Sequence, residues 1–154
     1  MHTSSQLTGR ILNGTLGGAV DVIHPVVDIR DAGYAHYRAF ITEGIHGQRF
    51  LIHKDSICHI ELSRRLAQEF GKYGYPISTH PMTYEEVVAK MKAGAFILEF
   101  VLAQYDKPLY LSNEKSIRLL GMTYSRPSMD SALEEAYSLI KRGLVEDRIS
   151  QKTK

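Results

Sequence analysis

The stretch that decides the fold is Tyr110-Leu-Ser-Asn-Glu-Lys-Ser-Ile-Arg-Leu-Leu-Gly121, followed by Ala136-Tyr-Ser-Leu-Ile-Lys-Arg-Gly-Leu-Val145. The first part predicts a helix that Ser112 or Asn113 caps and that ends at Gly121, because short polar residues favour helix starts and glycine favours helix ends. The second part predicts the end of a helix that begins over 127–130 and stops at Gly143. One face of that helix would carry Leu133, Ala136, Tyr137 and Ile140.

Upstream of these helices the chain alternates between extended and helical patterns. Residues 20–29 are extended and apolar, and Pro25 favours an edge position or a strand start. A helix is predicted over 31–42, with Asp31 as its cap and Ala35, Ala39 and Phe40 on its buried face. Residues 48–53 alternate and are rich in strand-forming residues, which predicts a strand.

The middle of the chain predicts two further helices. One begins at Asp55 or Ser56, and its Leu62, Leu66, Ala67 and Phe70 form a stripe that faces the core. The other starts at Thr83 and runs to about residue 104, with Gly94 as a weak point, and an extended piece follows over 107–111. The predicted fold class is therefore α/β with more helix than strand.

Composition restricts the class of protein. A length of 154 residues fits one domain, and a net charge of +2 without a basic helical face gives no support for nucleic-acid binding, so we expect no nucleic-acid partner. The single cysteine, Cys58, indicates a reducing compartment and reads as a structural thiol. The start of the chain has no signal-peptide pattern, and the apolar run 93–103 is too short to span a membrane. We therefore expect a cytoplasmic protein with no membrane partner.

An ordered set of short motifs runs from Gly18 to Val145: Val-Asp-Ile-Arg-Asp at 27–31 with a His five residues on, Gly-Gln-Arg-Phe-Leu-Ile at 47–52, Tyr-Pro at 75–76, Glu-Lys-Ser at 114–116, Leu-Gly at 120–121, Ser-Leu-Ile at 138–140 and Gly-Leu-Val at 143–145. This set resembles the C-terminal half of an extended short-chain dehydrogenase/reductase, within the NAD-dependent epimerase/dehydratase superfamily. The resemblance is closest to the branch of dihydroflavonol reductase, cinnamoyl-CoA reductase and aldehyde/ketone reductases.

The resemblance implies the C-terminal part of a Rossmann-type fold, with few strands, a helix-rich substrate lobe and no nucleotide-binding first half. It divides the chain into a flexible lead-in over 1–17, which could be a short helix or a loop, a substrate-binding half over 18–148 and a tail over 149–154. Complete enzymes of this kind transfer hydride between NADP(H) and a carbonyl or alcohol. Carried onto this sequence, the substrate pocket would include Val20, His24 and Pro25.

Two segments resemble motifs that the family uses for cofactor binding and catalysis. The glycines of the segment 8–17 resemble a pyrophosphate-binding turn, but their spacing is wrong by two residues and no apolar strand precedes them. Tyr137 and Lys141 match Tyr-x-x-x-Lys, but they lie inside the terminal helix, where Tyr137 reads as a core or rim aromatic. We therefore assign no catalytic and no cofactor-binding residue, and we expect the chain alone to bind no NADP(H).

The remaining polar residues read as structural. Six histidines show no metal-ligand spacing, so no metal site is assigned: His24, His36, His46, His53, His59 and His80. Asp28, Arg30 and Asp31 form the best polar cluster. A helix cap with a local ion pair is the favoured interpretation, and a brace of the substrate pocket against the nucleotide lobe is the alternative.

Three functions remain open from the sequence. The leading hypothesis is a partial reductase that supplies the substrate-binding lobe and is inactive alone, pairing with a missing N-terminal half. The second is a non-catalytic interaction module, or a self-associating remnant, that uses the apolar surface left by that half. The third is a complete small enzyme that uses Tyr137 and Lys141.

Overall fold

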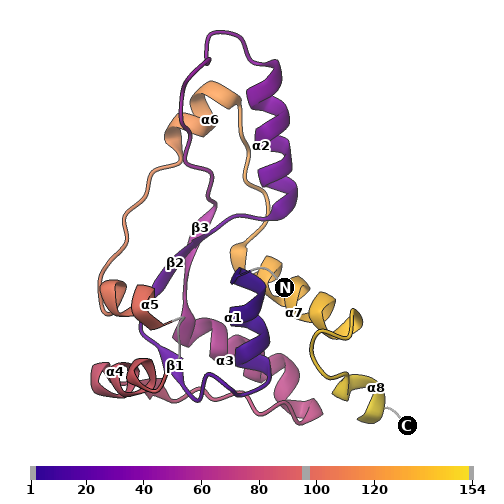
Figure 1. Ribbon diagram of the computed structural model, residues 1–154. Coiled ribbons are helices and arrows are strands. Elements are labelled where there is room, and N and C mark those ends of the chain that lie inside the picture. Colours follow the sequence, from indigo (N-terminus) through magenta and orange to yellow (C-terminus); the bar gives the residue numbers. More distant parts are fainter. Residues whose placement is uncertain (1–2, 95–97, 153–154) are drawn as a thin grey trace.

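The computed structural model describes residues 3–94 and 98–152, which form a helix-rich α/β fold with short strands (Figure 1). The strands are β1 (Ala19–Val20), β2 (Ile23–Val26), β3 (Asp55–Cys58) and β4 (Pro81–Met82). The helices are α1 (Thr3–Leu12), α2 (Ile29–Ile41), α3 (His59–Phe70), α4 (Tyr84–Lys92), α5 (Leu98–Gln104), α6 (Glu114–Leu120), α7 (Ser128–Lys141) and α8 (Arg148–Lys152), with a 3-10 turn, η1 (Gly71–Tyr73), after α3. The predicted fold class is confirmed.

The described strands form two small sheets rather than one. β1 pairs with β4 in parallel, and β2 pairs with β3 in antiparallel register, with His24 opposite Ile57 and Pro25 opposite Ser56. In Figure 1, β2 and β3 run up the middle of the molecule, α2 and α6 lie side by side above them, and the remaining helices lie below. Pro25 therefore occupies a strand with an open edge among the described residues, as predicted.

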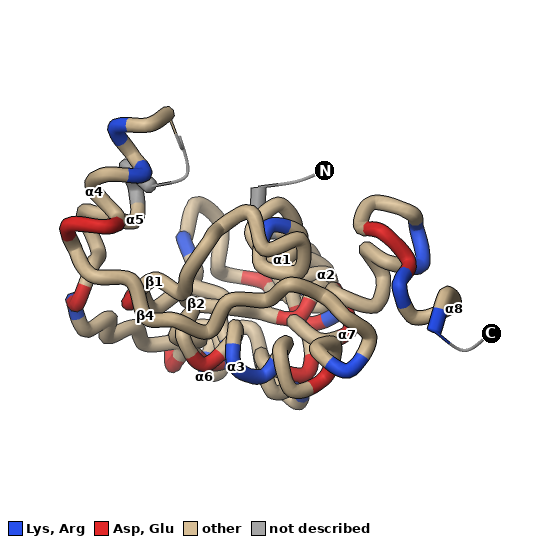
Figure 2. Tube along the Cα trace, turned by 90° about the horizontal axis from the view of Figure 1, so that it is seen from below, with Lys and Arg blue, Asp and Glu red and all other residues tan. Residues whose placement is uncertain are grey.

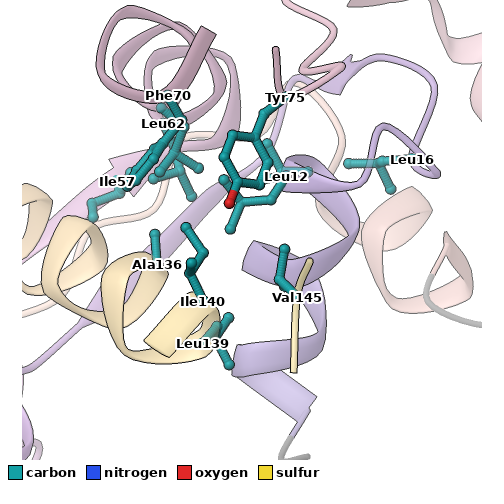
Figure 3. Packing of buried hydrophobic residues seen from close by; sticks show 12 residues of the cluster. Leu12, Leu16, Ile57, Leu62, Phe70, Tyr75, Ala136, Leu139, Ile140 and Val145 are labelled. Atoms are coloured by element: carbon teal, nitrogen blue, oxygen red, sulfur yellow. The ribbon is translucent and has the colours of Figure 1, made fainter. Parts of the chain in front are cut away.

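The main core lies where α1, α3 and α7 meet below the β2–β3 pair (Figure 3). Leu12, Leu66, Phe70 and Ala136 are fully buried there, and Ile57 reaches the cluster from β3. Two smaller clusters accompany it. One lies around β1, β4 and α4, and the other lies between α2 and the residues that follow α6. The predicted stripe of α3 and most of the predicted face of α7 are therefore confirmed.

The lead-in contains a packed helix, the first of the two forms that the sequence allowed. Ile11 and Leu12 of α1 are buried in the main core, and the Thr8 hydroxyl donates a hydrogen bond of 2.6 Å to Glu135 of α7. The flexibility predicted for 1–17, and the limits predicted at residues 17 and 148, stay predictions.

The prediction of a strand over 48–53 is wrong, because this segment is coil and β3 begins only at Asp55. No described strand pairs with it, so its alternating side chains do not form a ladder. Phe50 and Ile52 instead pack against the cluster beside α2, while Leu51 is exposed.

The start and the buried face of α2 also differ from the prediction. Asp28, and not Asp31, is the cap, since its carboxylate accepts a hydrogen bond of 2.8 Å from the backbone N–H of Arg30. Ala35 is buried as predicted, but Ala39 and Phe40 are exposed, and Phe40 is 90% exposed. The apolar side chains of α2 therefore lie on two faces, and among the described residues only one of these faces is buried.

The predicted helix over 83–104 is divided into α4 and α5, with Gly94 in the left-handed region at a φ of 91° between them. Residues 95–97, which fall inside the predicted helix, lie outside the described residues. Thr83 and Glu86 form a capping box at the start of α4, and Gly121 ends α6 in the left-handed conformation, as the sequence predicted. The piece over 107–111 is coil.

Figure 2 shows Lys and Arg residues interspersed with Asp and Glu residues along the described chain. This distribution agrees with the net charge of +2. Among the described residues, no helix is long and apolar enough to cross a membrane.

Candidate functional site

The three residues predicted to bind substrate lie at the junction of β1 and β2, but the structure does not bring them together. Val20 is buried in the cluster formed by β1, β4 and α4. His24 is half-buried, and Pro25 is exposed. His24 and Pro25 are neighbours in a strand, so their side chains point to opposite faces of the sheet. Their role in binding stays a prediction.

The best-defined polar feature at this junction is a contact between two histidines. The ring of His24 on β2 meets the ring of His59 edge-on, with ring centroids 4.4 Å apart. His59 is the first residue of α3 and is only 2% exposed. Both nitrogens of its ring, and the hydroxyl of the buried Ser63 four residues on, lack a hydrogen-bond partner in the described part of the chain.

Burial sets the protonation state of this pair. It lowers the pKa of His59 to about 3, with a smaller contribution from the neighbouring His24, and it also lowers the pKa of His24. Both rings are therefore neutral near pH 7, and His59 is too weak a base to take up a proton there. This geometry suits a packed, apolar junction better than an acid/base centre.

Sequence reasoning missed that His59 and Ser63 are both buried polar residues without a hydrogen-bond partner among the described residues. A signal was present, since the two residues are four apart and fall on the same helical face as Leu62, Leu66 and Phe70. The stripe predicted for that helix therefore extends to its first turn and includes two polar side chains.

The polar cluster after β2 forms the favoured cap and ion pair, and it also joins α2 to α7. The buried Asp28 carboxylate accepts hydrogen bonds of 2.6 Å from both Nε and Nη2 of Arg30, and one of 2.7 Å from the Ser131 hydroxyl. Nη2 of Arg30 also lies 2.7 Å from Glu134. Chiefly because of the hydrogen bonds from Arg30, the pKa of Asp28 is far below its usual range. Asp31 is buried in the first turn of α2 but takes no part in this network.

The Tyr137 and Lys141 pair does not have the geometry of a proton donor and its activating lysine. The Tyr137 hydroxyl donates a hydrogen bond of 2.6 Å to the Glu69 carboxylate of α3. This hydrogen bond raises the pKa of Tyr137 to about 12, whereas an activating ammonium would lower it. Lys141 is exposed at the end of α7.

The glycine-rich segment does not form a pyrophosphate-binding turn either. A turn of that kind lies between a strand and the start of a helix, whereas Gly14 and Gly17 follow the end of α1. A Cβ atom on Gly14 would lie 2.4 Å from the backbone oxygen of Pro76, so this glycine permits close packing against the chain after α3. The segment 8–17 therefore does not have the geometry of a pyrophosphate-binding turn.

The described residues also contain no cluster of three or more acidic, histidine or cysteine side chains that could hold a metal. The half-buried Cys58 has its Sγ 4.0 Å from Oδ1 of Asp21. Cys58 is the last residue of β3, and its role as a structural thiol stays a prediction.

An open groove of about 450 Å³ lies near the C-terminal end, lined by Tyr73, Gly74, Glu146, Arg148, Gln151 and Lys152. Its cations are occupied within the chain, because Arg148 donates to the carbonyl of Gly74 and Lys152 donates to the carbonyl of Lys72. Each of these contacts holds the cation against a backbone carbonyl of the segment that follows α3.

Solved structures show where this fold occurs, although no protein-family model and no curated protein sequence matches the chain. A nucleoside-diphosphate-sugar epimerase from Pseudomonas aeruginosa is similar over 94% of this chain, with a TM-score of 0.73 and 22% identity. The protein gox2253 is similar over 94% of the chain, with a TM-score of 0.68 and 16% identity. The chain spans only 44% and 46% of the length of these two proteins. At this identity the likeness shows the fold, which is the partial, C-terminal part of an epimerase or Rossmann-type structure.

Proposed function

We propose that this chain is the substrate-binding half of an extended short-chain dehydrogenase/reductase and that it is inactive by itself. The proposal rests mainly on one comparison of lengths. The structural match to the epimerase covers 94% of this chain but only 44% of the epimerase. The ordered motifs from Gly18 to Val145 support the reductase branch. In the complete enzyme, this half would cover a small carbonyl or alcohol substrate in the cytoplasm.

The cofactor belongs to the complete enzyme in this proposal. NADP(H) would supply or accept a hydride there, and the residues that hold it would lie outside this chain. Two observations support the proposal that the cofactor site lies outside this chain. The Tyr137 hydroxyl is hydrogen-bonded to the Glu69 carboxylate, and Gly14 and Gly17 follow a helix rather than precede one. Val20, His24 and Pro25 remain the proposed substrate contacts.

A titration with NADPH tests this proposal. The purified chain is titrated while the fluorescence of the dihydronicotinamide is followed, and an intact extended reductase is measured in parallel as the positive control. We expect saturable binding for the control alone. Saturable binding to this chain in the micromolar range would contradict the proposal, because the described residues offer no pyrophosphate turn.

A second candidate function is a non-catalytic interaction module. The observation that favours it is the outer face of α2, where Ile29 is 81% exposed and Phe40 is 90% exposed. Exposed apolar patches of this kind mark interaction surfaces in soluble proteins.

A further inference from the structure

We draw no further inference here: the strongest candidate, the contact between His24 and the buried ring of His59 at the junction of β2 and α3, belongs to the site already described.

Discussion

The hydroxyl of Tyr137 on α7 donates a hydrogen bond of 2.6 Å to the Glu69 carboxylate on α3. The bond ties together two of the helices that enclose the main core, and it lowers the pKa of Glu69 while it raises that of Tyr137. A tyrosine that is harder to ionise than usual is a poor proton donor in hydride-transfer chemistry. This relationship argues against Tyr137 as a proton donor that Lys141 activates.

We expect Tyr137→Phe to leave function unchanged and to lower the free energy of unfolding by less than about 1 kcal/mol, because the hydrogen bond is partly exposed. Urea unfolding measures the stability, and NADPH oxidation measures turnover. Tyr34→Phe on α2 is the control for removing a hydroxyl. NADPH-dependent turnover that is present in the wild type and absent in Tyr137→Phe would refute this interpretation.

Several helix ends were predictable from the sequence because their signals are local, but the helix predicted to begin at Asp55 or Ser56 begins at His59, since residues 55–58 form β3. Thr83 with Glu86, Gly121 and Gly143 mark helix ends through contacts or conformations that span only a few residues. The stripe of α3 is also local, since side chains three and four residues apart share a face.

The errors arose where structure depends on distant partners. The segment 48–53 has the pattern of a strand, but a strand needs a neighbour, and none of the described segments pairs with it. The apolar character of Phe40 predicts a place in the core, yet its side chain is 90% exposed. His24 and His59 are in contact although their residue numbers differ by 35. No short-range sequence pattern predicts such a contact.

Acid should destabilise the fold through His59. The pKa of its folded form, about 3, is below the value of about 6.5 expected in the unfolded chain, so unfolding takes up a proton between these values. The buried, neutral ring of His59 therefore makes its full contribution to the free energy of unfolding above about pH 6.5. It falls by roughly 1.4 kcal/mol for each pH unit below that value. Urea unfolding between pH 7 and about pH 4 measures this slope.

His59→Leu should flatten that slope, because it replaces the buried imidazole with an apolar side chain. His46 is exposed in the turn after α2, so His46→Leu is the control and should keep the slope of the wild type. Equal pH slopes for wild type and His59→Leu would show that His59 does not lose its proton on burial.

Asp28→Asn should lower the free energy of unfolding by about 1–3 kcal/mol at neutral pH, since it removes the charge that holds Arg30 and weakens the cap of α2. Because the pKa of Asp28 is lowered by folding, its contribution is present above the unfolded value of about 3.9 and is lost as the pH falls through and below that value. The two proteins should therefore converge in stability in acid. Asp130→Asn, at an exposed position in the first turn of α7, should cost less than about 1 kcal/mol.

Gly14→Ala should destabilise the chain more than Gly44→Ala. Both glycines have a φ near 70°, so each substitution carries the same backbone cost of about 1–2 kcal/mol. Only at Gly14 would the new Cβ meet the backbone oxygen of Pro76, whereas nothing lies within 4 Å at Gly44. Thermal unfolding measures the difference. Equal losses would mean that the segment after α1 is not packed as described.

The central claim is that this chain is one half of an extended reductase, and the most direct test is to sequence the transcript upstream of the codon for Met1. The account predicts an in-frame extension that encodes a Thr-Gly-x-x-Gly-x-x-Gly turn and a Tyr-x-x-x-Lys pair. A stop codon immediately upstream, with no such segment in frame, would contradict it and would favour the interaction module.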